Sequence, residues 1–236
     1  MSRHAFKIIA LALLVQVAAA GASYRAQAQT PPQSPYPAMA PLEQYLIADE
    51  ASEIALARSA APPSISDAAE VMVLRRDGYQ TAAKGTNGFV CLVERSWATA
   101  TDTAEFWNPH LRAPHCFNAA AAKTFAPIFL MKTKLVLAGK SPAEIATAVN
   151  SALDTHQIPA LAPDAMCYMM SKQQYLNDAA KNWHPHLMWF VSGDAEKTWG
   201  ANLPASPIIA VNDAQERVTV FMVVVPKWSD GTAAAK

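Results

Sequence analysis

The chain of 236 residues is 52% hydrophobic and 16% charged, and its 19 basic residues balance its 19 acidic ones. These values are typical of a folded chain and exclude a disordered one. Lysine and arginine are scattered along the sequence, which excludes the concentrated basic footprint that nucleic-acid binding requires. We therefore expect no nucleic-acid partner.

The first 28 residues have the features of a secretory signal peptide. Arg3 and Lys7 give a basic start, residues 8–20 are apolar except for Gln16, and Ala26-Gln27-Ala28 provides small residues at a cleavage site. The apolar run is too short to span a bilayer stably. We therefore expect an exported protein that is periplasmic or secreted after cleavage of residues 1–28.

Cleavage after residue 28 leaves 208 residues, with 16 basic and 19 acidic side chains and a net charge of −3. Cleavage after Ala20 or Ala22 is the alternative. The remaining chain is long enough for one domain with a substantial core. Since no later apolar run reaches the length of a membrane span, we expect no transmembrane segment in the mature form.

A proline-rich segment, residues 29–41, follows the signal peptide and is interpreted as an extended, poorly ordered tether. Apolar residues then recur among acidic ones over residues 42–59, which predicts an amphipathic helix. Pro62 and Pro63 are expected to end it.

Two dipeptides predict tight turns in the next segment. Asp77-Gly78 and Asn87-Gly88 are typical of type I′ hairpins, and each lies between strand-forming runs. We expect a three-stranded antiparallel meander of residues 70–76, 79–86 and 89–95. The third strand is apolar on both faces, which predicts an interior position in its sheet.

Helical signals dominate the middle of the chain. Residues 96–117 lack a regular period and are interpreted as a long loop. Asn118 is expected to cap a helix that Pro127 splits. Ser141-Pro142-Ala143-Glu144 is a capping-box sequence with proline at the first helical position, and it predicts a further helix to about residue 155.

The last third of the chain returns to strand patterns. The final predicted strand is apolar on both faces, which predicts a central position. Strands, then helices, then strands indicate an α+β domain over residues 42–231, with a mainly antiparallel sheet of about seven strands and three or four helices. The four predicted strands of this third are residues 166–171, 184–191, 207–211 and 217–225.

The three cysteines are Cys91, Cys116 and Cys167. In an oxidising compartment, an odd count predicts one disulfide and one remaining thiol. The sequence does not choose among the three pairings. The alternative is three buried, reduced cysteines that pack as small hydrophobic residues.

A histidine pair is the first candidate site. His184 and His186 are two residues apart at the start of a predicted strand, so both imidazoles could face one zinc or copper ion. A third ligand would come from His115, His110 or Cys116. Methionines nearby in the sequence favour copper(I) over zinc. The alternative is a structural role for the histidines, partly buried against the strand.

Cys116 is the second candidate. It lies two residues before the predicted helix cap, and a helix N-terminus lowers the pKa of a thiol. A cysteine before a helix and a later histidine on a strand is the order in papain-like cysteine hydrolases. Cys116 would then be the nucleophile and His186 or His184 the base. The residues around Cys116 do not match those families' motifs, and a disulfide is the alternative.

Aromatic residues form a third candidate feature. Trp183, Trp189 and Trp199 lie close together in the sequence, with Tyr175 upstream. Such rings can line a ligand groove, although indoles more often contribute to a core.

Three segments together resemble a group of exported bacterial proteins with no known activity: residues 84–91 (KGTNGFVC), 164–170 (DAMCYMM) and 183–188 (WHPHLM). The resemblance covers roughly residues 41–231 and implies a single domain. It implies no ligand, cofactor or catalytic residue.

These observations favour an exported envelope protein that binds a small ligand or an envelope component without catalysing a reaction. The two alternatives are a zinc or copper protein that uses His184, His186 and His115, and a cysteine hydrolase that uses Cys116 and His186.

Overall fold

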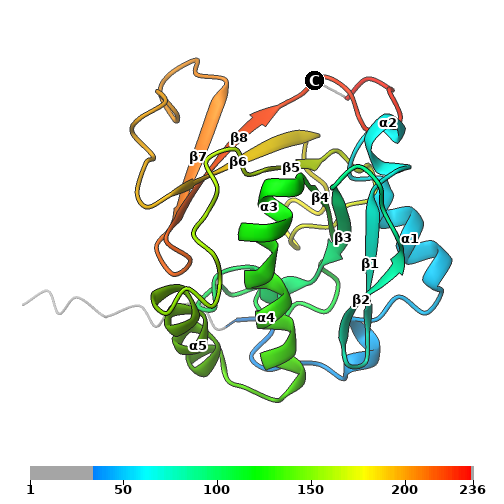
Figure 1. Ribbon diagram of the computed structural model, residues 1–236, viewed down its shortest axis with the longest axis vertical. Helices are drawn as coiled ribbons and strands as arrows, with labels where there is room; N and C mark the ends of the chain where they lie inside the picture. Colours follow the sequence, from blue (N-terminus) through cyan, green and yellow to red (C-terminus); the bar gives the residue numbers. More distant parts are fainter. Residues whose placement is uncertain (1–33, 235–236) are drawn as a thin grey trace, which may run out of the picture. The chain divides into compact units, whose positions relative to one another are not determined.

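The computed structural model describes residues 34–234, and the predicted signal peptide lies outside this range. Within it, eight strands form one sheet in the order β2-β1-β3-β4-β5-β6-β8-β7 (Figure 1). Among these eight strands, only β1 and β3 are parallel neighbours. The α+β class is therefore confirmed, and residues 34–234 form eight strands rather than about seven and five α-helices rather than three or four.

The N-terminal segment differs from the single predicted helix. A 3-10 turn (Leu42–Gln44) is followed by a separate helix, α1 (Glu50–Arg58). The break occurs because Asp49 caps α1, its carboxylate accepting from the backbone N–H groups of two residues in the first turn. Pro63 then begins α2 (Pro63–Ser66). Residues 34–41 of the predicted tether contact the domain, where the Tyr36 hydroxyl donates to Asp178 over 2.7 Å.

The predicted meander is only half correct. Strands β1 (Glu70–Arg75) and β2 (Gly78–Ala83) form the expected hairpin, but β3 (Val90–Glu94) pairs in parallel with β1 instead of antiparallel with β2. The connection crosses the start of β1, where the Glu70 N–H donates to the Phe89 carbonyl over 2.9 Å. Gly85 permits this crossing, since a Cβ there would lie 2.1 Å from the Glu70 nitrogen.

A strand replaces part of the predicted loop over residues 96–117. Strand β4 (Ala113–Phe117) is buried along its whole length and lies between β3 and β5 (Met166–Met169). The sequence does not predict β4 because it contains Pro114. Proline has no backbone N–H to donate to a neighbouring strand, so it argues against a central strand. As predicted, β3 is an interior strand, between β1 and β4.

The helical predictions for the middle of the chain are confirmed. Asn118 caps α3 (Ala119–Thr124), and Pro127 lies in the first turn of the separate helix α4 (Ala126–Leu137). The capping box of Ser141 and Glu144 opens α5 (Pro142–Asp154) with both of its reciprocal hydrogen bonds. Within residues 34–234, no helix has the length and apolarity needed to cross a membrane.

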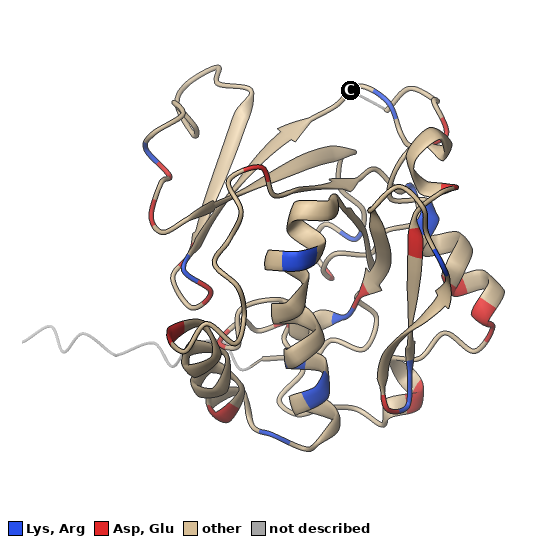
Figure 2. Cartoon of the chain, viewed as in Figure 1, with Lys and Arg blue, Asp and Glu red and all other residues tan. Residues whose placement is uncertain are grey.

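The remaining strands are β6 (His186–Ser192), β7 (Ile208–Asp213) and β8 (Val218–Val224). Strand β8 lies between β6 and β7, so it is an interior strand, but it is next to the edge strand β7 and not at the centre of the sheet as predicted. Basic and acidic residues are interspersed over the helices, strands and loops (Figure 2).

Alternate residues of the strands point to opposite sides of the sheet and contribute to separate cores, of which the two largest lie on opposite sides. On one side, which we call the α1 face, Cys91 and Cys116 pack with Ala57 of α1. On the other side, the α4 face, Leu92 and Phe117 pack with residues of α3 and α4. In Figure 1, α3 and α4 lie in front of the sheet and α1 lies at its side.

Candidate functional site

The candidate site is a cavity of about 320 Å³ on the α4 face, a size at the lower end of small-molecule sites. Its walls come from strands β3 to β8, from α4, and from the loops on either side of them. The apolar part of the wall includes Leu111, Phe125, Phe129, Met169, Met188 and Phe190, and the polar part includes Glu94, His115 and His186.

The sheet register places two of these polar residues in one row. Cys116 on β4 pairs with Tyr168 on β5, so the same register places the next residue, His115, opposite Met169. Met169 in turn pairs with His186 on β6. Directly opposite side chains on neighbouring strands have Cβ atoms roughly 5 Å apart. In the next row Cys167 pairs with Met188, which pairs with Met222 on β8. The floor of the cavity is therefore rich in imidazole and sulfur.

Both histidines of the row are held in the same tautomer. The His115 Nδ1 lies 3.0 Å from the Ala113 carbonyl, and the His186 Nδ1 lies 2.8 Å from the His184 carbonyl. Because a carbonyl only accepts, each Nδ1 carries the hydrogen and each Nε2 keeps its lone pair. Burial lowers the pKa of His115 to about 3 and also lowers the pKa of His186. Both rings are therefore neutral acceptors.

Glu94 is the most unusual polar group of the cavity. Its side chain is 7% exposed, and one carboxyl oxygen lies 3.5 Å from the His115 Nδ1. The other oxygen, Oε1, has no hydrogen-bond partner among residues 34–234. Burial raises the pKa of Glu94 well above its usual range, Glu216 raises it further, and Lys132 opposes the shift. The protonated carboxyl is therefore favoured.

A buried ion pair borders the same cavity. The Lys132 ammonium donates to the Glu216 carboxylate and to the carbonyls of Ala98, over 3.1 Å, and Thr99, over 2.9 Å. All three ammonium hydrogens are thus used. Burial raises the pKa of Glu216, and the positive charge of Lys132 opposes this shift without reversing it. The pair links α4 to the β7–β8 turn.

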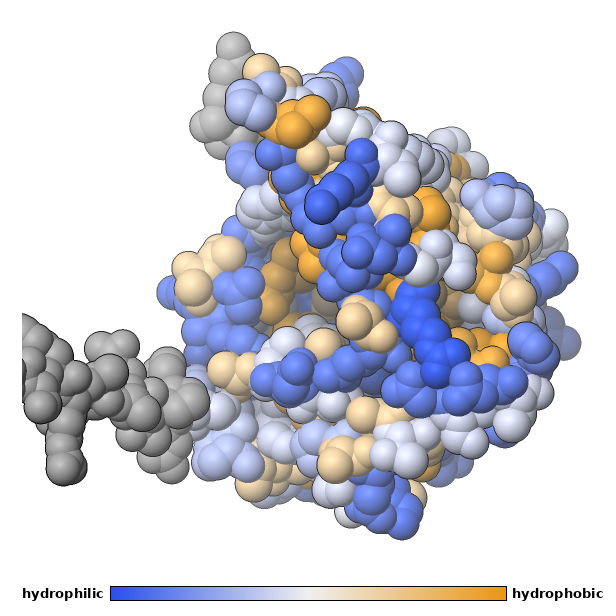
Figure 3. Space-filling model, turned by 90° about the vertical axis from the view of Figure 1, so that its left-hand side faces the viewer, coloured by the Kyte–Doolittle hydropathy of each residue, from blue (hydrophilic) through white to orange (hydrophobic). Residues whose placement is uncertain are grey.

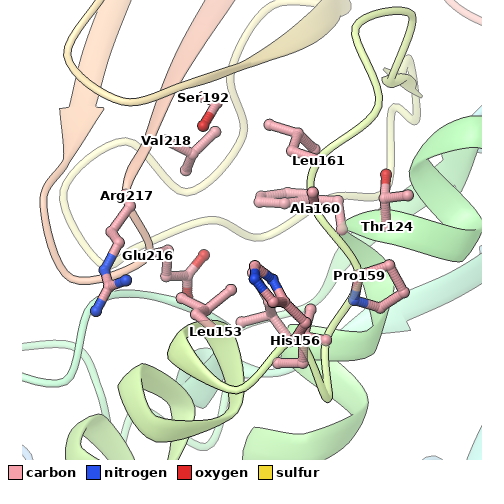
Figure 4. Close-up of a pocket in the computed structure, with 13 residues that line it drawn as sticks. Thr124, Leu153, His156, Pro159, Ala160, Leu161, Ser192, Glu216, Arg217 and Val218 are labelled. Carbon is pink, nitrogen blue, oxygen red and sulfur yellow. The ribbon is translucent and has the colours of Figure 1, made fainter.

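A second, smaller pocket of about 200 Å³ shares Phe125 and Glu216 with the cavity. Figure 4 shows the His156 ring on the same side as Glu216, whereas the Arg217 side chain points away. Arg217 instead pairs with Asp154 over 2.7 Å. None of the unpartnered buried side-chain atoms of residues 34–234 belongs to this pocket. We therefore place the candidate site in the larger cavity.

The predicted histidine pair is not brought together in one environment. His184 precedes β6 and is exposed, whereas His186 is buried in the cavity wall. His115, the proposed third ligand, does line the cavity with His186. Within the described part of the chain, no group of three histidine, cysteine, aspartate or glutamate residues is placed to hold a metal ion.

The predicted nucleophile is part of a disulfide. Cys116 is bonded to Cys91 across β3 and β4, and Cys167 remains a buried thiol. The sulfur of Cys116 packs on the α1 face, whereas His186 lines the cavity on the α4 face. The Cys116–His186 hypothesis is therefore not supported, because the sheet separates the two side chains and no thiolate is available.

The predicted aromatic groove is divided between the two faces. Trp183 lines the cavity, and its ring centroid lies 4.7 Å from that of His186. Trp199 instead stacks on Phe221 at 4.2 Å, and Trp189 packs in the same separate cluster. In Figure 3, part of the apolar surface lies in a recess that hydrophilic side chains border.

Sequence reasoning missed Glu94, Lys132 and Glu216. A signal was present for Glu94, which is two residues beyond Leu92 and hence on the same face of an interior strand. A carboxyl group at such a position must be buried. Lys132 likewise lies among apolar residues of α4, but its partner is 84 residues away.

No protein-family model, curated protein or solved structure matches this chain. The functional argument therefore depends on the cavity itself. Its polar groups include the Glu94 carboxyl, which can donate a hydrogen bond, two imidazoles that can accept one, and the carboxyl groups of Asp213 and Glu216.

Proposed function

We propose that the protein is an exported, non-enzymatic binding protein whose cavity on the α4 face holds a small, mainly apolar molecule. The unpartnered Oε1 of buried Glu94 is the observation that carries this proposal. An unsatisfied buried polar atom costs about 1–3 kcal/mol. A ligand that hydrogen-bonds to Glu94 removes that cost while its apolar body covers the aromatic and methionine side chains.

A titration with the fluorescent apolar probe N-phenyl-1-naphthylamine tests the proposal. We expect saturable enhancement of its emission and about tenfold weaker binding in Ala113→Leu, which fills part of the cavity. Ala143→Leu, the same change at an exposed position on α5, is the matched control and should bind as the wild type does. No enhancement, or equal weakening in both variants, would contradict a ligand-binding cavity.

Export is the second part of the proposal. The signal-peptide features of residues 1–28 support it, and so does the Cys91–Cys116 disulfide, since such bonds persist in oxidising compartments. N-terminal sequencing of protein from the periplasm or the medium is expected to begin after Ala28, or after Ala20 or Ala22. A chain that keeps Met1 and stays in the cytoplasm would contradict export.

Binding of copper(I) is a second candidate function for the same cavity. The row of His115, Met169 and His186 provides two imidazoles and a thioether, soft donors that suit copper(I) better than zinc. The carbonyl that accepts from each Nδ1 orients the ring and leaves Nε2 free, as in many metal-binding histidines.

Competition with a coloured copper(I) chelator, with ascorbate as reductant, tests this candidate. We expect the wild type to remove one equivalent of copper(I) from the chelator and His115→Phe/His186→Phe to remove none. Replacement of two histidines that do not line the cavity, His110→Phe/His156→Phe, is the matched control. Wild-type protein that leaves the chelator fully loaded would exclude this function.

A further inference from the structure

The candidate cavity and the smaller pocket lie end to end along β6 and β8 on the α4 face. Three cross-strand pairs give their order, because alternate residues of a strand point to the same side of the sheet. The first two pairs line the cavity and the third lines the smaller pocket: Met188–Met222, Phe190–Val220 and Ser192–Val218. Since each residue of an antiparallel strand advances about 3.4 Å, the three pairs extend over about 14 Å.

Phe125 separates the cavity from the smaller pocket. Its side chain lines both, and its ring stacks on that of Phe190, with the two centroids 3.9 Å apart. Phe125 lies between α3 and α4 and belongs to neither helix. Glu216 also lines both, but its carboxylate is held by Lys132. The Phe125 ring therefore ends the cavity at the side of the smaller pocket.

The opposite end of the cavity is polar. His186 lies two residues before Met188 on the same face of β6, and it shares a row of the sheet with His115. One carboxyl oxygen of Glu94 lies 3.5 Å from the His115 Nδ1, and the other has no partner among residues 34–234. This end therefore offers hydrogen bonds to a polar head group.

The smaller pocket has polar side chains that are already engaged. The Thr124 hydroxyl donates to the Ala120 carbonyl over 2.8 Å, and Arg217 pairs with Asp154 over 2.7 Å. Figure 4 shows apolar side chains around the same pocket, among them Leu153, Leu161 and Val218. Space beyond Phe125 therefore suits the apolar part of a ligand.

Two further carboxyl groups line the cavity, and both have partners. Glu216 accepts from Lys132, and Asp213 accepts from the backbone N–H groups of Gln215, over 2.9 Å, and of Glu216, over 3.0 Å. An alkyl chain that lies on β6 and β8 passes these groups without removing a partner from either of them.

A molecule with one alkyl chain and a polar head matches a cavity that runs along two strands and is polar at one end. We infer that the cavity binds a single-chain amphiphile, with its head group at Glu94 and its chain along β6 and β8, and that Phe125 sets the longest chain that it accepts. The inference rests on the proposed function, because it names the ligand class of the same site.

Displacement of N-phenyl-1-naphthylamine by straight-chain primary alcohols of six, eight, ten and twelve carbons tests the inference, since this series varies length and keeps the head group constant. Each methylene that becomes buried should tighten binding about fourfold. In the wild type we expect this gain up to 1-octanol. Longer chains meet the Phe125 ring, so 1-octanol and 1-dodecanol should bind within about twofold of each other.

Substitution of Phe125 is expected to remove the limit. Phe125→Ala joins the cavity to the smaller pocket, and 1-dodecanol should then bind at least about tenfold more tightly than 1-octanol. Phe125→Leu keeps the test available where the alanine variant does not fold, and it should give at least about a fourfold difference, the gain from one further buried methylene. Phe106→Ala is the matched control, because Phe106 is buried but lines neither space, and it should keep the wild-type limit.

A second substitution assigns the added length to the smaller pocket. Ser192 lines that pocket and not the cavity. Ser192→Phe in the Phe125→Ala background fills the space beyond Phe125, so 1-octanol and 1-dodecanol should again bind within about twofold of each other.

Four results would overturn the inference. They are a wild type whose affinity keeps rising to 1-dodecanol, a limit that Phe125→Ala and Phe125→Leu leave unchanged, an equal gain in Phe106→Ala, and a double variant that still prefers 1-dodecanol. In each case the probe still binds to the wild type, so the proposed function survives. A wild type that does not bind the probe contradicts both.

Discussion

The two faces of the sheet are packed in different ways. The α1 face is built from small side chains, with Ala57, Ala60 and Ala61 against valines and a disulfide. The α4 face is built from large ones, with Phe117, Phe125 and other aromatic rings against α3 and α4. The small residues let α1 approach the strands closely, whereas the large rings of the α4 face surround a cavity.

Both sides of the sheet bury polar groups. Helix α1 carries Glu53, which pairs with Arg95 over 2.9 Å, and Arg58, whose Nε lacks a partner among residues 34–234. On the α4 face Lys132 pairs with Glu216, and one oxygen of Glu94 lacks a partner among the same residues. The two faces therefore differ in the size of their side chains and in the cavity, and not in whether they bury charge.

The largest effect is expected from Lys132→Met. The substitution leaves Glu216 buried without its cation, which costs about 3–5 kcal/mol of unfolding free energy. Urea unfolding with the disulfide intact measures the loss. The double variant Lys132→Met/Glu216→Met removes both charges and should recover most of it, and a double variant as unstable as the single one would contradict this account.

The second largest loss of stability is expected from removal of the disulfide. Cys91→Ala/Cys116→Ala opens a loop between residues 25 positions apart and is expected to cost about 3 kcal/mol in the chain-entropy model. Dithiothreitol should destabilise the wild type but not this variant. Because the change lies on the α1 face, binding of N-phenyl-1-naphthylamine should not alter, and a large change would show that the two faces are coupled.

The packing of the two faces can be compared directly with one substitution at two buried alanines. Ala57→Leu places three carbons in the close-packed α1 face and is expected to cost about 1–3 kcal/mol. Ala113→Leu lies at the cavity, where space is available, and is expected to cost less than about 1 kcal/mol. Thermal unfolding measures both changes, and equal costs would argue against the difference in packing.

The smallest effect concerns pH. Burial lowers the pKa of His115 from 6.5 to about 3, so the unfolded chain binds a proton at a higher pH than the folded chain. His115 therefore contributes a loss of stability as pH falls below about 6.5, of about 1 kcal/mol between pH 6.5 and 5.5, whereas the raised pKa of Glu94 contributes with the opposite sign in both proteins. Between these two pH values the change in unfolding free energy of His115→Gln should differ from that of the wild type by about 1 kcal/mol, in favour of the variant at the lower pH. His186 keeps the same sign of dependence in both proteins.

Local signals in the sequence were sufficient for most of the elements. The Asn118 cap, the split at Pro127 and the capping box at Ser141 depend on neighbouring residues, and each is confirmed. The interior positions of β3 and β8 followed from strands that are apolar on both faces. The prediction of one disulfide and one free thiol required only the cysteine count and the expected compartment.

Pairings between distant segments were decided by the tertiary structure. The parallel partner of β3, the strand hidden around Pro114 and the choice of Cys91 for Cys116 depend on contacts that no local pattern encodes. The site depends on them most, because Glu94, His115 and His186 come from three strands and share a cavity only through the order of the sheet. Local chemistry fixes turns and caps, whereas burial and hydrogen-bond satisfaction are properties of the whole fold.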